Sequence, residues 1–154
     1  MTSVRFAQAS DIPALVELGR QIHVQSRYAW MNYSAGRTWQ HLERLVSNRG
    51  ACVIVATSHD ENGTAVSGVL IGTANQYPFN HDFVAEIELF YVVPHKRGTP
   101  LAMKMVTAFR RWANNREVAE ITITNQFGTG EARTARLFSK LGMPAVGGVH
   151  SMWV

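Results

Sequence analysis

Apolar positions along the first third of the chain follow one strand-like and two helix-like patterns. Residues 4–8 alternate in side-chain character, which predicts a short first strand. Ser10 and Pro13 then mark the start of a helix whose apolar stripe runs from Ile12 to Ile22. A second helix is predicted over residues 34–47 from its own apolar stripe.

The rest of the chain predicts a three-stranded meander followed by a crossover. Strands are expected at 51–57, 66–77 and 83–93, and Asp60-Glu61-Asn62-Gly63 predicts a hairpin between the first two. The later elements are a helix, a strand, a helix and a last strand, at residues 99–116, 118–124, 131–141 and 145–154. This order, β-α-α-β-β-β-α-β-α-β, predicts one α/β (α+β) domain over residues 1–154. Its mixed, mostly antiparallel sheet would have six to seven strands, flanked by about four helices.

Composition excludes several classes of protein. The chain has 154 residues, and its 46% hydrophobic content argues against intrinsic disorder. Cys52 is the only cysteine, so no disulfide framework is possible. The purest apolar run, residues 51–56, is far shorter than the roughly 20 residues that span a membrane. We therefore expect a cytoplasmic protein without a membrane partner.

The charge balance is mildly basic. The formal net charge is +4, with a pI near 9.6, which suits an anionic partner such as a phosphorylated cofactor. The basic residues are scattered rather than arranged in a stripe with aromatic residues, so no nucleic-acid partner is expected. The six histidines show no metal-ligand spacing, so no metal site is expected either.

A strand–turn–helix junction around residues 91–102 is the most informative segment for chemistry. Pro94 ends the strand, a basic turn with Lys96 and Arg97 follows, and the next helix begins near Thr99. The free N–H groups and positive dipole end at a helix start attract anions. From local physics alone, an anion site and an ordinary solvent-facing turn both remain open.

The strand before this junction carries two carboxylates, Glu86 and Glu88. A period of two places both on one face, with Ile87 and Leu89 on the other. Such a pair suits a general base that takes a proton from an amine. A solvated strand face remains the alternative interpretation.

Three segments together identify a family. Val92-Val93-Pro94 precedes Arg97-Gly98-Thr99-Pro100-Leu101-Ala102, which matches the signature Arg/Gln-x-x-Gly-x-Gly/Ala at its first and last positions. Residues 134–143 resemble a helix that usually ends Leu-Tyr-x-x-Leu-Gly-Phe, and residues 5–15 are a typical opening. With the order of elements, these motifs make essentially the whole chain resemble the GNAT superfamily of acyl-CoA-dependent N-acetyltransferases.

The resemblance implies acetyl-CoA as the cofactor. Its pantetheine arm would lie between two parallel strands ending near Val93 and Thr124, with its pyrophosphate on the amides of residues 97–102. Pro100 replaces the middle glycine and lacks an N–H, so we expect weaker affinity rather than none. The implied cofactor contacts are Tyr91, Val92, Val93, Arg97, Gly98, Thr99, Leu101, Ala102, Asn125 and Phe138.

The resemblance also implies an activity: acetyl transfer to the primary amine of a small molecule or peptide by direct attack, with Glu86 or Glu88 as base. Phe138 stands where many members have a tyrosine that protonates the leaving thiolate, and phenylalanine cannot donate a proton. An acyl-CoA-binding module with little or no turnover is therefore the alternative.

The implied acceptor site is aromatic. Tyr28, Trp30 and Tyr33 lie between the first two helices and could form a wall for a cationic amine, with Tyr77 opposite. A packed or dimer-facing loop is the competing interpretation. The apolar chain end, Met152 to Val154, would need cover as an edge strand, which predicts a homodimer.

Overall fold

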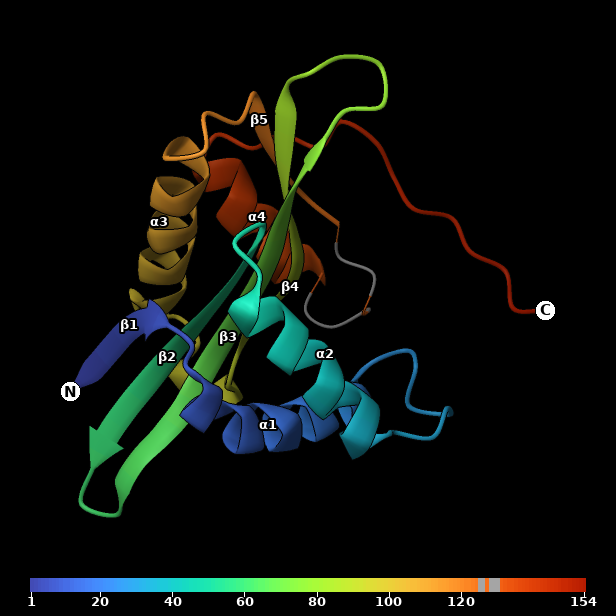
Figure 1. Ribbon diagram of the computed structural model, residues 1–154. Coiled ribbons are helices and arrows are strands. Elements are labelled where there is room, and N and C mark those ends of the chain that lie inside the picture. Colours follow the sequence, from blue (N-terminus) through green and yellow to red (C-terminus); the bar gives the residue numbers. More distant parts are fainter. Residues whose placement is uncertain (125–126, 128–130) are drawn as a thin grey trace.

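One five-stranded sheet organises the residues that the computed structural model describes, namely 1–124, 127 and 131–154 (Figure 1). The strands lie in their sequence order, with β1 to β4 antiparallel and β5 parallel to β4. Their bounds are β1 (Thr2–Phe6), β2 (Ala51–Asp60), β3 (Gly63–Gln76), β4 (Phe83–Val92) and β5 (Glu120–Ile123).

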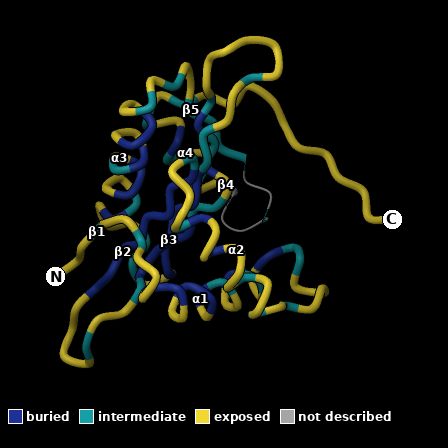
Figure 2. The backbone as a smooth tube through the Cα atoms, in the orientation of Figure 1, coloured by how far each residue is buried: buried dark blue, intermediate teal, exposed yellow. Residues whose placement is uncertain are grey.

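Helices cover both faces of this sheet, as Figure 1 shows. The α-helices are α1 (Ile12–Gln25), α2 (Ala35–Ser47), α3 (Leu101–Asn114) and α4 (Glu131–Lys140). Helices α1 and α2 share one core cluster with one side of the sheet, whereas α3 and Phe138 of α4 share a second with the other side. Figure 2 shows the burial concentrated between these layers. Among the described helices, none is both long and apolar enough to cross a bilayer.

The predicted order of elements is confirmed through α4, but the predicted last strand is wrong. Residues 145–154 form neither a helix nor a strand and are exposed throughout, with Val146 at 91% exposure. Gly147 and Gly148 give a strand no side chains to pack, and no strand edge pairs with this segment. The described sheet therefore has five strands rather than six to seven.

The hairpin between β2 and β3 forms where the sequence predicts it, but it is tighter. Asp60 pairs directly with Gly63, so that the loop is only Glu61 and Asn62. Gly63 has a φ of +115°, a region that glycine reaches without steric cost. Since both strands extend to this turn, the meander is longer than the apolar pattern alone indicates.

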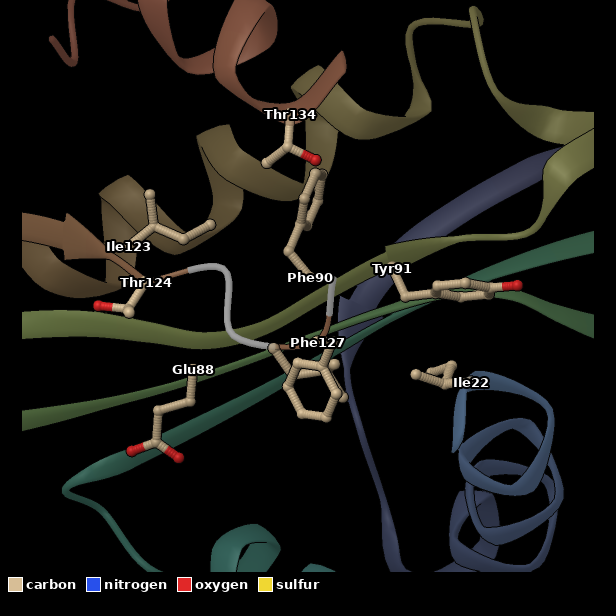
Figure 3. Close-up of a pocket in the computed structure, with 9 residues that line it drawn as sticks. Ile22, Glu88, Phe90, Tyr91, Ile123, Thr124, Phe127 and Thr134 are labelled. Carbon is tan, nitrogen blue, oxygen red and sulfur yellow. The ribbon is translucent and has the colours of Figure 1, made fainter. Parts of the chain in front are cut away.

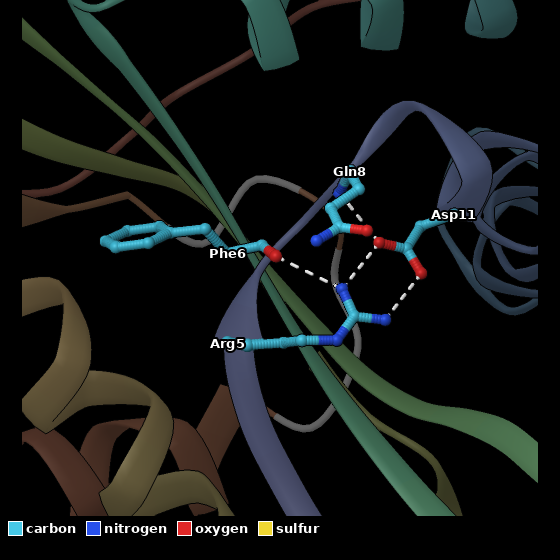
Figure 4. A network of polar contacts seen from close by, with 4 residues as sticks. All are labelled: Arg5, Phe6, Gln8 and Asp11. Carbon is cyan, nitrogen blue, oxygen red and sulfur yellow. Dashed lines mark hydrogen bonds and ion pairs between the residues drawn. The ribbon is translucent and has the colours of Figure 1, made fainter.

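An ion pair fixes the start of α1 (Figure 4). The Arg5 guanidinium donates to both carboxylate oxygens of Asp11, at 2.7 and 2.8 Å, and the Gln8 N–H donates to Asp11 Oδ2 at 2.7 Å. The hydrogen bonds from Arg5 hold the pKa of Asp11 below its usual range. Asp11, rather than the expected Ser10, therefore binds the backbone here, and it does so at Gln8, ahead of the 3-10 turn Ala9–Asp11 that leads into α1. Its side chain makes no capping hydrogen bond to α1 itself.

Candidate functional site

Strands β4 and β5 form a wedge that is closed at one end and open at the other. Their parallel pairing runs only from Val84–Glu120 to Ile87–Ile123, whereas β4 continues to Val92. The register between β3 and β4 also shifts here, because Ile87 pairs with Gly72 and Leu89 with Ile71. Glu88 is thus the extra residue of a β-bulge, a feature that redirects side chains near functional sites.

The open edge of β4 offers backbone hydrogen-bonding groups. The Val93 N–H donates to the Ser67 carbonyl of β3 at 2.9 Å. Successive residues of a strand point their backbone groups to opposite edges, so the N–H and carbonyl of Val92 face the wedge. The Arg97 Nε donates to that Val92 carbonyl at 2.9 Å.

A small pocket lies at the mouth of the wedge (Figure 3). Its volume of about 20 Å³ is enough for one water-sized molecule. Figure 3 shows Glu88 and Phe127 on one side of β4, with Phe90 and Thr134 on the other. The residues that line it are Ile22, Glu88, Leu89, Phe90, Tyr91, Ile123, Thr124, Phe127 and Thr134.

Glu86 projects from the face of β4 opposite Ala85 and Ile87, which lie in the α3-side cluster. Figure 3 shows Glu88 on the side of β4 away from Phe90, which packs against that same cluster. Leu89 was predicted to share the face of Ile87, but it packs against the α1-side cluster, because the bulge at Glu88 shifts the alternation.

Glu86 is half-buried and accepts a hydrogen bond from Thr124 Oγ1 at 3.3 Å. Glu88 is exposed and accepts one from Thr73 Oγ1 at 2.7 Å. Of the two, Glu88 is the carboxylate that lines the pocket.

The turn after β4 leads into α3 with polar backbone groups available. A short 3-10 helix spans Pro94–Lys96, Gly98 has a φ of +78°, and α3 begins at Leu101. Thr99 Oγ1 donates to the Lys96 carbonyl at 2.7 Å, which braces the turn. The first N–H groups of α3 have no partner inside the helix, so this helix start can accept an anion.

Arg97 is folded back onto the end of β4 rather than extended into solvent. Besides its bond to Val92, its guanidinium carbon lies 5.4 Å from the centre of the Tyr91 ring. The Tyr91 hydroxyl in turn donates to Gln25 Oε1 of α1 at 3.2 Å. Arg97 thus contacts the end of β4 directly and is linked to α1 through Tyr91. Its positive charge lies beside the turn.

The aromatic residues predicted for the acceptor site separate into two groups. Tyr28 and Trp30 lie together, both with rings edge-on to Trp153, and the Tyr28 ring also contacts Phe127 at 5.8 Å. Tyr33 instead donates its hydroxyl to the Val16 carbonyl of α1 at 2.7 Å. Of the three, Tyr28 contacts a residue that lines the pocket, and Trp30 is joined to Tyr28 through Trp153.

Tyr77 lies at the closed end of the wedge, beyond the end of β3. Its hydroxyl donates to Glu120, and this hydrogen bond is the main reason that the pKa of Tyr77 rises to about 12. Its ring stacks on Phe79 at 5.1 Å. The structure therefore places Tyr77 away from Tyr28 and Trp30.

Two further implied cofactor contacts need separate description. Asn125 lies outside the described residues. Phe138 is only 3% exposed, and its ring lies edge-on to Phe90 at 5.8 Å. Phe90 separates Phe138 from the pocket, so Phe138 supports the pocket wall from behind.

Sequence reasoning missed several residues at this site. Thr73 and Thr124 each donate to a candidate base, and Phe127 and Ile22 line the pocket. Thr73 pairs with Glu86 of β4, and paired residues of neighbouring strands lie on the same face of a sheet. The period of two along β3 could therefore have identified Thr73. No local pattern marks Phe127.

The sequence profile of the Acetyltransferase (GNAT) family matches residues 17–143. No curated protein sequence matches the chain closely enough to count as a relative.

Solved structures with the same fold include three acetyltransferases. A Trypanosoma brucei acetyltransferase superimposes with a TM-score of 0.75 at 15% identity, covering 100% of both chains. Glucosamine-6-phosphate N-acetyltransferase from Arabidopsis thaliana gives 0.77 at 15% identity, over 99% of this chain and 98% of that one. The aminoglycoside N-acetyltransferase AAC(6')-Iy in complex with CoA gives 0.77 at 13% identity, over 100% and 95%. At these identities the likeness shows the fold.

Proposed function

Because the chain belongs to the GNAT family of acetyltransferases, we propose that it transfers an acetyl group from acetyl-CoA to a primary amine. One observation carries the proposal: the open wedge between β4 and β5 has a carboxylate, Glu88, at its mouth and a basic helix start just after it. An extended acyl-thioester cofactor and an amine could meet there.

The residues present fit acetyl-CoA, which supplies an activated acetyl thioester. The Val92 N–H would hold the pantetheine arm, because it faces the open edge of β4. Arg97 and the Ala102 amide of α3 would hold the pyrophosphate, with Gly98 and Thr99 shaping the turn. The Leu101 amide donates to Thr99 Oγ1 at 3.4 Å and would have to exchange this bond for the phosphate. Pro100 removes one donor from this turn.

We assign the general base to the carboxylates of β4. Glu88 lines the pocket and can take the amine proton directly, while Glu86 can act through Thr124 or water. Thr73 and Thr124 orient these carboxylates by donating to them.

Direct attack by the amine requires no covalent enzyme intermediate. The cysteine of this chain, Cys52, lies in β2, and burial raises the pKa of its thiol to about 12. A thiol in that state is a poor nucleophile at neutral pH. Phe138 supplies no proton to the departing thiolate, so solvent would supply it.

The test is release of CoA thiol from acetyl-CoA with and without primary amines. Amine-dependent release, with one acetyl group added to the amine by mass spectrometry, is the expected result. Binding of acetyl-CoA with no release for any amine would favour the alternative, an acyl-CoA-binding module with little turnover.

The proposal extends to the protein's setting. We infer a homodimer, because the exposed chain end leaves Val146, Met152 and Val154 uncovered. We also infer a cytoplasmic setting from the single cysteine, and no nucleic-acid partner from the scattered basic residues. Light scattering should give about twice the chain mass of 17.1 kDa at micromolar concentration. A particle of one chain mass would contradict the dimer.

A further inference from the structure

Two polar side chains of β3 lead to the carboxylate of Glu88. Thr73 Oγ1 donates to Glu88 Oε1 at 2.7 Å, and Asn75 Nδ2 donates to Thr73 Oγ1 at 3.2 Å. Thr73 and Asn75 are two residues apart along one strand, so both project from the same face of the sheet. We call this chain of two hydrogen bonds the β3 relay.

The bond from Asn75 sets the direction of the Thr73 hydroxyl. A threonine hydroxyl has one proton to donate, and its oxygen also accepts hydrogen bonds. Because the Asn75 amide donates to the Thr73 oxygen, the Thr73 proton is directed to Glu88. This bond uses Oε1 of Glu88, so the proton of an amine would go to Oε2.

Thr73 is a firm support for the Glu88 carboxylate. It lies in the middle of three strands, paired with Ala51 of β2 on one side and with Glu86 of β4 on the other, and it is half-buried. Its β-branched side chain has few available rotamers. Thr73 therefore presents its hydroxyl from a fixed position in the sheet.

Glu88 depends on such support because of its place in β4. The bulge skips it in the pairing with β3, where Ile87 pairs with Gly72 and Leu89 with Ile71. The pairing of β4 with β5 stops at Ile87. Since Glu88 is also exposed, the β3 relay rather than packing holds its carboxylate in one orientation.

The other candidate base, Glu86, is held less closely. Thr124 Oγ1 donates to it at 3.3 Å, which is longer than an ordinary hydroxyl hydrogen bond. Thr124 lies just beyond Ile123, the last residue of β5. Of the two carboxylates, Glu88 lines the pocket. Support and position therefore both distinguish Glu88 from Glu86.

We propose that Thr73 and Asn75 are positioning residues that make Glu88, rather than Glu86, the general base. The β3 relay would hold Glu88 so that Oε2 takes the proton of the amine as the amine attacks the thioester. The inference rests on the proposed function, because it takes acetyl transfer to occur at the wedge.

The first test compares Thr73→Val with Thr73→Ser, using the primary amine that gives the fastest CoA release. Valine keeps the shape of threonine and suits a strand, but it lacks the hydroxyl. Thr73→Val should lose about tenfold or more in kcat, with the KM for the amine near the wild-type value, because a base displaced by about 1 Å can cost up to about 10²-fold. Thr73→Ser should restore most of the rate.

The matched control is Thr122→Val. Thr122 is also a half-buried strand threonine and pairs with Glu86 across β4 and β5, but its hydroxyl bonds to neither Glu86 nor Glu88. This variant should keep the wild-type kcat. A wild-type kcat in Thr73→Val as well would overturn the inference while leaving acetyl transfer intact.

Double-mutant cycles show which carboxylate the β3 relay serves. The loss caused by Thr73→Val should persist in a Glu86→Gln background and nearly disappear in a Glu88→Gln background. Asn75→Ala should lose less than Thr73→Val, and it should cause no further loss when combined with Thr73→Val. An equal loss from Thr73→Val in both backgrounds would make Thr73 merely structural and overturn the inference.

NMR gives a readout that does not depend on turnover. In protein with carbon-13-labelled glutamate, the side-chain carboxyl resonance that disappears in Glu88→Gln belongs to Glu88. At pH 7 this resonance should shift in Thr73→Val and keep its position in Thr122→Val. An unshifted resonance in Thr73→Val would overturn the inference. If no amine releases CoA, acetyl transfer itself is contradicted, and the resonance still decides whether Thr73 holds Glu88.

Discussion

At the scale of single residues, substitution of Arg97 tests whether the turn after β4 binds the cofactor. Its side chain bonds the Val92 carbonyl and lies over Tyr91, so it supports the end of β4 as well as adding charge beside the turn. Arg97→Ala should therefore weaken acetyl-CoA binding by about 1–3 kcal/mol, the usual worth of charge-assisted hydrogen bonds. Isothermal calorimetry measures this loss directly.

The control for Arg97 is Arg44→Ala. Arg44 is an exposed residue of α2, and its removal changes the net charge by the same amount. Binding should stay at the wild-type level in this variant. Equal affinity in wild type and Arg97→Ala would show that the turn after β4 does not hold the cofactor's phosphates.

At the scale of elements, the junction of β1 and α1 depends on Asp11. Asp11→Asn should destabilise the fold by about 1–2 kcal/mol, because the carboxylate serves both Arg5 and the Gln8 N–H. Arg5 is itself 39% exposed, so solvent screening keeps the loss in this range. Urea unfolding at pH 7 provides the measurement.

The same variant has a defined pH dependence. The folded-state pKa of Asp11 is lowered, so its stabilisation is present above the unfolded pKa of about 4 and is lost as pH falls through the lower folded value. The gap between wild type and Asp11→Asn should therefore shrink below about pH 4. Glu17→Gln, which breaks an exposed 3.4 Å pair with Arg20, should change stability by less than about 0.5 kcal/mol at any pH. A gap that is constant with pH would refute the role of the Asp11 charge.

Elements set by local signals could be predicted from the sequence, and those set by distant partners could not. The turn from Asp60 to Gly63 forms where predicted, because the residue types that favour a tight hairpin all lie within these four positions. The prediction of a last strand was wrong because a strand must pair with the edge of a neighbouring strand. Residues 145–154 pair with no strand of the described sheet.

The candidate site divides in the same way. The face of Glu86 and the turn at Arg97 could be predicted, because a period of two and a helix start are local features. The bulge at Glu88 could not, because it depends on how β4 pairs with β3, and it turns Leu89 towards the α1-side cluster. Tyr33 was expected to face the acceptor, but its hydroxyl reaches Val16 of α1, a contact that depends on helix packing. Trp153 contacts Trp30 from the other end of the chain, a contact that no local pattern reveals.

At the scale of the whole molecule, the reactivity of the Cys52 thiol measures how often the packed sheet and helices open to solvent. It lies in β2, is 2% exposed, and the pKa of its thiol is raised to about 12 by burial. Because thiolates rather than thiols react, a disulfide reagent at pH 8 should label native protein far more slowly than a cysteine peptide. Labelling should speed up with urea across the unfolding transition. Native labelling as fast as the peptide's would mean that the sheet opens without unfolding.

The two core clusters explain how one fold positions both halves of the proposed chemistry. Helices α1 and α2 pack on one face of the sheet, and the loop between them brings Tyr28 against Phe127 at the pocket. Helix α3 packs on the other face and presents its N-terminus just after β4. The wedge lies where these two coverings meet, with Glu88 at its bulge.

The most direct test of this account is the turnover of Glu86→Gln and Glu88→Gln. These changes keep the shape of each side chain, so each variant should bind acetyl-CoA as wild type does. If acetyl transfer at the wedge uses a β4 carboxylate as base, one of the variants should lose roughly 10²–10⁴-fold in kcat between pH 6 and pH 9. Wild-type turnover by both variants across that range would contradict the assignment and make the two carboxylates structural.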